Sequence, residues 1–212
     1  MNRLIHEEVY RGEALLKKMA AQPFVICGAG AIGSNLVNNM VRQGFEKITV
    51  IDFDRIEDHN LHTQVWGRRH CGQLKAGMLK NIMHETVGAR IEAVTKKLEK
   101  GNCKKLLPKG SVVIDGFDNA ESRNLVADYC RDNGIECLHS GLYQDCAEVT
   151  WNERYILPGD PKGGDVCEYP LARNVIMLAV AVTTDVIIRY LDEGVKENYT
   201  ITLKDFRISL RD

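Results

Sequence analysis

Acids, amides and a cation follow one another in that order along one stretch of the sequence, IDFDRIEDHNLHTQVWGRRHCGQLK. An apolar run ends at Asp52, and Asp54 follows two residues later. Asn60 and Gln64 come next, and Lys75 closes the stretch. A carboxylate at the end of a strand can grip ribose hydroxyls, while amides and a lysine can bind phosphate oxygens. The stretch therefore predicts a nucleotide-binding site.

A glycine motif precedes this stretch and supports the same prediction. Gly28, Gly30 and Gly33 lie between an apolar run and a helical pattern. In such a motif the first glycine permits a tight turn, the second lets phosphate approach the backbone, and the third lets the helix pack on the sheet. Asp52 follows Gly33 by 19 residues, the usual place for a carboxylate that binds ribose. NAD, FAD and ATP share adenosine, so this motif does not choose among them.

The charges beyond Asp52 favour ATP. A triphosphate brings several negative charges that must be neutralised before phosphorus can react, whereas nicotinamide needs no cations beside the ribose. Lys75, Arg68 and Arg69 could supply those cations. Asp118 follows the apolar run SVVIDGF, where it could hold Mg²⁺ or simply cap the next helix.

The candidate residues must be brought together by a sheet. The apolar runs in PFVICG, ITVIDFD and SVVIDGFD alternate with helical patterns, which predicts an α/β, Rossmann-like fold with a mostly parallel sheet flanked by helices. We expect one helix over residues 4–20 and a long one over about 170–193. Further strands are expected in RIEAVTKKL, IECLHSGLY, AEVTWNERYIL and NYTITLKDFRISL, with antiparallel strands in the C-terminal part. Residues 1–212 are expected to form a single domain.

The overall composition excludes several classes of protein. With 44% hydrophobic and 27% charged residues, the chain has the balance of a globular protein. Its net charge of -1 shows no general preference for nucleic acid or an anionic membrane, so we expect neither as a partner. The seven cysteines contain no Cys-x-x-Cys pair, which argues against a disulfide framework or a zinc ribbon. The charged N-terminal residues are wrong for a secretory signal, and we expect a cytoplasmic protein.

Four segments together resemble the ThiF/MoeB/HesA family, the bacterial relatives of ubiquitin-activating enzymes. They are GAGAIGSNL, IDFD…NLHTQ, GQLKAGMLKNI and VIDGFDNAESRNLV, in the family's order and spacing. The resemblance implies an enzyme that adenylates a carboxylate with Mg-ATP, commonly the C-terminal Gly-Gly of a ubiquitin-like or sulfur-carrier protein. It also makes a homodimer plausible. The resemblance implies these roles: Gly28, Gly30 and Gly33 for the phosphates, Asp52 for the ribose, Asn60, Gln64 and Lys75 for the triphosphate, and Asp118 for magnesium.

The chain departs from the family pattern in three places. The pattern Asn-Leu-x-Arg-Gln has Thr63 where the arginine belongs, so either Arg68 or Arg69 replaces it or the activity is altered. The family's zinc-binding cysteine pairs are missing. Many members carry an N-terminal arginine that reaches into the partner subunit's site, and Arg11 is a loosely placed candidate.

Cys167 lies in GGDVCEYP, after a glycine-rich loop and before the long helix. The resemblance places a cysteine in this crossover region in several members, where it takes the acyl group as a thioester or forms a persulfide. A helix start would lower the pKa of the thiol, whereas Asp165 and Glu168 would raise it. A plain packing role is the alternative.

Two other interpretations stay open. A non-catalytic partner subunit of an activating enzyme is favoured by Thr63, and an NAD-dependent oxidoreductase by the glycine motif alone. A related variant of the family activates a small-molecule or RNA-borne carboxylate. His139-Ser140 lies in a strand pattern without an evident acid, and we interpret the pair as structural.

Overall fold

The computed structural model describes residues 3–157 and 170–211, and eight strands within these ranges form one sheet. The order across the sheet is β3-β2-β1-β4-β5-β6-β7-β8. The strands are β1 (Phe24–Cys27), β2 (Ile48–Ile51), β3 (Glu92–Val94), β4 (Val112–Asp115), β5 (Glu136–Tyr143), β6 (Cys146–Trp151), β7 (Asn198–Thr202) and β8 (Arg207–Arg211).

The type of strand pairing changes from parallel to antiparallel at β5. Strands β1 to β5 pair in parallel, and β5–β6, β6–β7 and β7–β8 pair antiparallel. This confirms the predicted mostly parallel sheet with antiparallel strands in the C-terminal part. Because parallel strands end at the same edge, the loops that leave them lie together.

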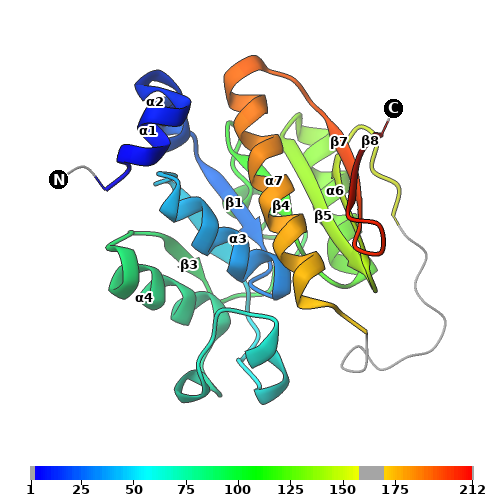
Figure 1. Ribbon diagram of the computed structural model, residues 1–212. Coiled ribbons are helices and arrows are strands. Elements are labelled where there is room, and N and C mark those ends of the chain that lie inside the picture. Colours follow the sequence, from blue (N-terminus) through cyan, green and yellow to red (C-terminus); the bar gives the residue numbers. More distant parts are fainter. Residues whose placement is uncertain (1–2, 158–169, 212) are drawn as a thin grey trace.

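Helices cover both faces of the sheet; α3 and α7 lie on the near face in Figure 1, and α6 lies behind it. The α-helices are α1 (Ile5–Arg11), α2 (Glu13–Ala21), α3 (Ala31–Arg42), α4 (Lys75–Val87), α5 (Cys103–Leu106), α6 (Ala120–Asn133) and α7 (Arg173–Glu193). Two 3₁₀ helices, η1 (Asp58–His62) and η2 (Arg68–His70), lie in the stretch that carries the candidate amides and arginines.

Alternate residues of the parallel strands feed two separate cores. On β1, Phe24 and Ile26 pack with α2, α3, α4 and α7, while Val25 and Cys27 pack with α5 and α6. Both sets are buried, which explains why the strands read as unbroken apolar runs. The buried strands are therefore held rigid where their loops leave the carboxyl edge.

Some predicted elements differ from the structure. The single helix expected over residues 4–20 is broken into α1 and α2 at Gly12, whose φ of +83° no helix accommodates. The last predicted strand segment is a hairpin, β7–β8, and the last part of AEVTWNERYIL is not strand. The long helix begins at Arg173, a few residues later than expected.

Helix α7 is the one helix in the described ranges whose length and composition would suffice to cross a membrane. Half of its apolar window is buried in this fold, where Val175, Ile176, Ala179 and Val180 pack in the larger core. The core-facing side of this helix is therefore buried, whereas Met177 is 44% exposed.

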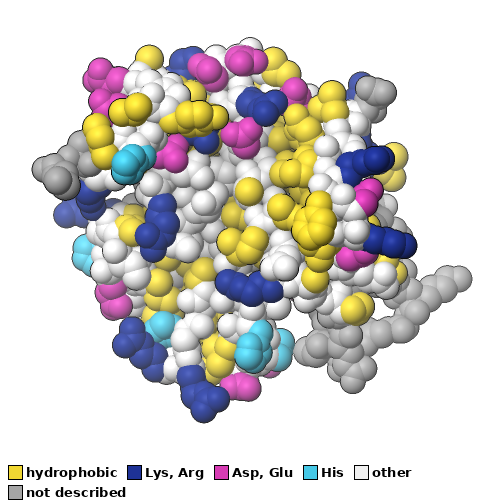
Figure 2. All heavy atoms as spheres, viewed as in Figure 1, with side chains coloured by type: hydrophobic (Ala, Val, Ile, Leu, Met, Phe, Trp, Pro, Cys, Tyr) yellow, Lys and Arg dark blue, Asp and Glu magenta, His cyan; other side chains and the backbone are white. Residues whose placement is uncertain are grey.

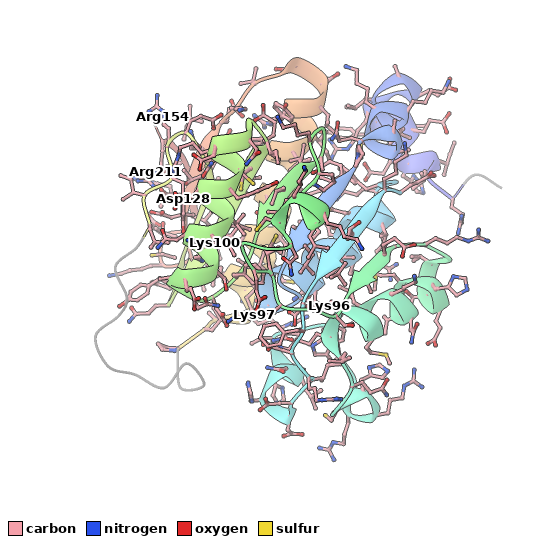
Figure 3. The ribbon with its side chains drawn as sticks, turned by 180° about the vertical axis from the view of Figure 1, so that it is seen from behind. Lys96, Lys97, Lys100, Asp128, Arg154 and Arg211 are labelled. Atoms are coloured by element: carbon pink, nitrogen blue, oxygen red, sulfur yellow. The ribbon has the colours of Figure 1, made fainter. Side chains whose placement is uncertain are left out.

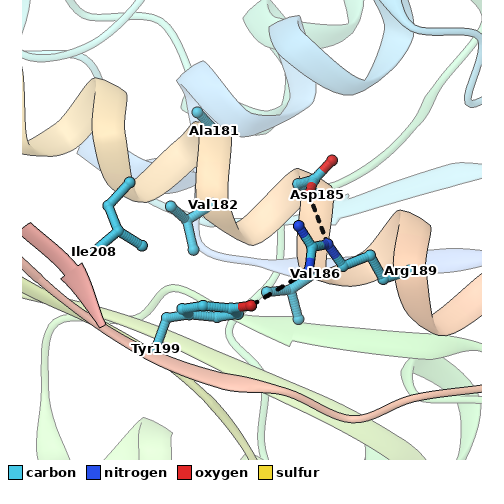
Figure 4. A pocket seen from close by; sticks show the side chains of 7 residues that line it. All are labelled: Ala181, Val182, Asp185, Val186, Arg189, Tyr199 and Ile208. Atoms are coloured by element: carbon cyan, nitrogen blue, oxygen red, sulfur yellow. Dashed lines mark hydrogen bonds and ion pairs between the residues drawn. The ribbon is translucent and has the colours of Figure 1, made fainter. Parts of the chain in front are cut away.

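A hollow of about 260 Å³ lies between α7 and the β7–β8 hairpin (Figure 4). Hydrophobic side chains gather on this side of the molecule in Figure 2. Val182, Tyr199 and Ile208 line the hollow, and the Asp185–Arg189 ion pair borders it. None of its lining residues is a predicted nucleotide ligand, so this hollow is separate from the candidate site.

Candidate active site

Three loops that are distant in the sequence leave the sheet side by side. Cys27 at the end of β1 pairs with Ile51 of β2 on one side and with Asp115 of β4 on the other. The residues that follow these strand ends are 28–33, 52–54 and 116–118. The structure therefore brings the glycine motif, the two acids and Asp118 to one edge of the sheet, as the sequence predicts.

Each glycine of the motif has a different steric setting. Gly28 has a φ of +94°, and Phe117 Cδ1 would lie 3.4 Å from a Cβ placed on it. A Cβ on Gly33 would lie 1.9 Å from the carbonyl oxygen of Gly28, so the start of α3 packs directly on the turn. A Cβ on Gly30 would meet nothing within 4 Å. Open space at Gly30 is what an approaching phosphate needs.

This contrast predicts opposite results for two alanine variants. Gly33→Ala should lower the free energy of unfolding by about 3 kcal/mol or more, because backbone must move to admit the methyl group. Gly30→Ala should leave the thermal unfolding midpoint unchanged but weaken ATP binding about tenfold, because the methyl group would occupy the predicted path of the phosphate. Calorimetric titration and thermal unfolding of both variants test this. Equal ATP affinity in Gly30→Ala and the wild type would contradict it.

Asp52 is 5% exposed, and backbone amides hold both of its carboxylate oxygens. Oδ2 accepts a hydrogen bond from Ala29 N at 2.7 Å, and Oδ1 accepts one from Asp54 N at 2.8 Å. Burial raises the pKa of Asp52 above its ordinary value, despite the opposing effects of the Ala29 amide and of Lys75. The carboxylate thus joins the glycine turn to the segment that follows β2.

Lys75 is the first residue of α4, and its side chain is only 11% exposed. Its Nζ lies 3.3 Å from Oδ2 of Asp54, and its backbone N–H donates to the Asp54 carbonyl at 2.8 Å. A cation in such a shielded place interacts with charges more strongly than a lysine in water. The structure therefore assembles Asp52, Asp54 and Lys75 as predicted.

Asn60 and Gln64 are both buried, and each braces the polar loop through its carbonyl oxygen. Asn60 Oδ1 accepts from Glu57 N at 3.0 Å, and Gln64 Oε1 accepts from Trp66 Nε1 at 2.5 Å. The NH₂ group of each amide is then left to bind a ligand. It is a hydrogen-bond donor, which is what a phosphate oxygen requires. This structural role was not evident from the sequence.

The two candidate arginines are exposed residues of the 3₁₀ helix η2. Arg69 Nε donates to His70 Nε2 at 3.0 Å, and within the described ranges neither Arg68 nor Arg69 forms an ion pair. Thr63, which replaces the family arginine, has its carbonyl bonded by Asn35 Nδ2 at 2.8 Å. The structure does not bring either arginine into contact with Asp52 or Lys75, so their role stays a prediction.

Asp118 is exposed on the turn between β4 and α6. The alternative that it caps α6 is wrong, because Asn119 is the N-cap and its Oδ1 accepts from Ser122 N at 2.9 Å. Asn119 Nδ2 also lies 3.4 Å from Asp118 Oδ1. The carboxylate is thus available for a ligand. No group of three or more His, Cys, Asp or Glu residues is placed to hold a metal among the described residues.

A buried polar network under this turn was missed from the sequence. His139 Nδ1 lies 2.9 Å from Asp115 Oδ2, and its Nε2 lies 2.9 Å from Asn152 Oδ1. The interpretation that His139 lacks an acid is therefore wrong, although its structural role stands. Cys137 lies 3.5 Å from the ring, but burial raises the pKa of this thiol well above its ordinary value. The pairing follows from the sheet register, in which Asp115 of β4 lies beside His139 of the neighbouring parallel strand β5.

Two other candidates fall outside the site. Cys167 lies outside the described residues. Arg11 lies on α1, where its guanidinium pairs with Glu7 at 2.7 Å and with Asp185 at 3.6 Å. Arg11 is thus committed to contacts within its own chain.

The charge of the chain is unevenly distributed, although its total is -1. The segment of residues 96–109 contains six lysines and one glutamate, and all six lysines are exposed. Figure 3 shows three of them, Lys96, Lys97 and Lys100, on the loop between β3 and α5. The expectation that nucleic acid does not bind rests on total charge alone and stays a prediction.

Comparisons with known proteins point in one direction. The model of the ThiF family matches residues 1–159. The chain is 26% identical over 141 residues to the SAMP-activating enzyme E1 of Haloferax volcanii, covering 63% of this chain and 50% of that protein. It is 28% identical over 161 residues to the sulfur carrier protein adenylyltransferase of Thermus thermophilus, covering 75% of this chain and 58% of that protein. The chain thus spans about half the length of these curated relatives.

Solved structures show the same fold. The structure of E. coli MccB with MccA-N7isoASN superposes with a TM-score of 0.82, covering 100% of this chain and 71% of that chain at 17% identity. E. coli tRNA N6-threonylcarbamoyladenosine dehydratase, in complex with ATP, superposes with a TM-score of 0.64, covering 70% and 65% at 23% identity. At these identities the likeness establishes the fold alone, and it confirms the Rossmann-like prediction.

Proposed function

This chain belongs to the ThiF family, and from that premise we propose that it is an ATP-dependent adenylyltransferase that activates a carboxylate. The observation that carries the proposal is the shielded Lys75, which lies 3.3 Å from Asp54 and close enough to Asp52 to oppose the rise in its pKa. A triphosphate requires a cation beside the ribose site, and nicotinamide does not. Relatives named as an activating enzyme and an adenylyltransferase support the same reaction.

The proposed ligands divide by the part of ATP they bind. The open backbone at Gly30 receives phosphate, between the structural glycines Gly28 and Gly33. Asp52 binds the ribose hydroxyls. The remaining contacts to the triphosphate are assigned to Asn60, Gln64, Lys75 and Arg69, with Arg68 as the alternative arginine and Asp54 orienting Lys75.

A magnesium ion fits the exposed carboxylate of Asp118. Mg²⁺ is commonly bound through one or two carboxylates together with substrate phosphates and water, so a single protein carboxylate is sufficient. When bound, the ion would offset negative charge on the phosphates. Asp118 is the residue that would hold it.

The reaction requires placement and charge rather than proton transfer. A carboxylate oxygen of the substrate attacks the α-phosphorus and forms the acyl-phosphate bond. The bond from the α-phosphorus to the bridging oxygen breaks, and its electron pair leaves with pyrophosphate. Because the carboxylate is already a nucleophile, no general base is needed. Lys75 and a nearby arginine stabilise the charge that moves onto the leaving group, an effect worth several kcal/mol in such sites.

We propose a ubiquitin-like protein, a sulfur-carrier protein or a peptide as the substrate, activated at its C-terminus. The names of the relatives support this class: SAMP-activating, sulfur carrier and SUMO-activating enzymes are among them. A homodimer in the cytoplasm is proposed from the family. The dehydratase relatives that act on tRNA keep a small-molecule or RNA-borne carboxylate as the alternative.

Cys167 is proposed as a covalent acceptor in a second step. Its thiolate would attack the acyl carbon of the adenylate, forming a thioester while AMP leaves with the electron pair of the broken bond. A Cys167→Ala variant should then keep pyrophosphate exchange but form no adduct that hydroxylamine or a thiol removes. An adduct of that kind on the variant would exclude the step.

Pyrophosphate exchange tests the function directly. Radioactive pyrophosphate should enter ATP only when a carboxylate substrate is present, and mass spectrometry should detect the acyl-adenylate. The candidates are proteins and short peptides that end in Gly-Gly. ATP binding without exchange for any substrate would favour the non-catalytic subunit that Thr63 suggests. Tight binding of NAD in place of ATP would favour the oxidoreductase.

The raised pKa of Asp52 predicts how ribose recognition depends on pH. As the pH falls, a carboxyl with a raised pKa takes up its proton at milder acidity than an exposed aspartate, and it loses its charged acceptor oxygens. The affinity advantage of ATP over 2′,3′-dideoxy-ATP should therefore shrink as the pH is lowered from 7 toward that pKa. Because both nucleotides carry the same phosphates, the ratio of their Kd values isolates the ribose contact. A ratio that stays constant down to the ordinary aspartate pKa would contradict the assignment.

A further inference from the structure

The turn that presents Asp118 is held by charged side chains on both sides. Asp115 Oδ1 accepts a hydrogen bond from the backbone N–H of Phe117 at 3.1 Å. The carbonyl of Phe117 accepts one from Nε of Arg123, in α6, at 2.5 Å. The peptide groups on either side of Phe117 are thus fixed, one by an anion and the other by a cation.

Two further hydrogen bonds fix the guanidinium of Arg123. Nη1 donates to the hydroxyl of Tyr155 at 3.0 Å, and Nη2 donates to the carbonyl of Ser140 at 3.2 Å. Gly141 leaves it room, because a Cβ there would lie 3.4 Å from Nη1. Burial lowers the pKa of Arg123, but Asp115, Tyr155 and Asp118 together raise it by more, so the charge is kept. Three donors with different partners fix the plane of the side chain.

The other end of the network is equally constrained. The ring of Tyr155 stacks on His139, with centroids 3.6 Å apart and planes at 4°. His139 in turn contacts Asp115. Arg123 therefore belongs to a closed set of contacts that links α6, β4, β5 and the residues that follow β6.

We infer that Arg123 is a positioning residue for the adenylation reaction, acting through Asp118. The carbonyl of Phe117 and the N–H of Asp118 belong to one planar peptide group, so the bond from Arg123 sets the direction in which the Asp118 side chain leaves the backbone. The inference rests on the proposed function for the role of Asp118. Contacts to the nucleotide are not required of Arg123 itself.

Replacing Arg123 by lysine tests this with the charge retained. Lysine cannot make three bonds in one plane, so the 117–118 peptide is released. We expect kcat for pyrophosphate exchange to fall about 10²-fold, because misplacing a catalytic group by about 1 Å can slow a reaction by that factor. The KM for ATP should change less than about threefold. Arg131→Lys, on the exposed side of the same helix, is the matched control and should exchange like the wild type.

A double-mutant cycle separates positioning from general structure. If Arg123 acts through Asp118, then Arg123→Lys should cost less than about threefold further in an Asp118→Asn background. Equal losses in both backgrounds would mean that Arg123 supports the fold at large, and would overturn the inference.

Nuclear magnetic resonance gives a readout without any activity. The backbone amide signal of Asp118 should move strongly in Arg123→Lys and stay in place in Arg131→Lys. An unmoved Asp118 amide would overturn the inference whatever the kinetics. If the wild type exchanges no pyrophosphate with any carboxylate, the proposed function fails, whereas the Asp118 amide still decides whether Arg123 holds the turn.

Discussion

Replacing Lys75 by alanine should abolish carboxylate-dependent pyrophosphate exchange, with a loss of about 10³-fold in kcat/KM. The reason is the setting of this lysine: its side chain is 11% exposed and lies among Asp52 and Asp54 at the proposed ribose and phosphate site. A charge in that shielded place would stabilise the departing pyrophosphate more than a solvated lysine could. The variant should still fold, because Asp54 is half exposed and water can solvate it.

A neighbour on the same helix gives the control for this experiment. Lys80 lies on α4, is 45% exposed and pairs with Glu92 at 3.2 Å. Lys80→Ala should therefore exchange at the wild-type rate. Exchange and thermal unfolding are measured on both variants. Exchange by Lys75→Ala within about threefold of the wild type would remove the proposed mechanism.

Asp118→Ala should lower exchange by about 10²-fold to 10³-fold. This carboxylate is exposed on a turn at the carboxyl edge of the sheet and is the proposed holder of magnesium. Removing it should leave stability nearly unchanged, because Asn119, and not Asp118, caps α6. Asp128→Ala, on α6 and paired with Arg131 at 2.9 Å, is the control and should be active. Full activity of Asp118→Ala over a range of magnesium concentrations would show that the ion is held elsewhere.

Local patterns in the sequence predicted the central strands and the glycine turn, which depend on residues close together in the chain. The strands β1, β2 and β4 read as apolar runs because both faces of the sheet are covered. Gly134 ends α6 in a left-handed conformation, which glycine adopts without strain. The glycine turn and Asp52 follow from one short motif and its spacing.

What was missed depends on contacts between distant residues. Nothing in the pattern of residues 4–20 shows that Gly12 takes a positive φ. The pairing of Asp115 with His139 depends on β4 and β5 lying side by side, and the bond from Arg123 to Phe117 depends on where α6 begins. Asn60 and Gln64 were recognised as polar candidates, but their part in bracing the loop depends on Glu57 and Trp66.

The held carboxylate of Asp52 has a consequence for the entropy of the proposed nucleotide binding. Since Ala29 and Asp54 immobilise both oxygens, the rotamer entropy that a loose aspartate would forfeit on meeting a sugar is already lost when the chain folds. Recognition of the ribose then requires no rearrangement of this side chain. Asp52 is thus a preorganised ligand in the proposed site, and adenosine should meet it as a rigid template.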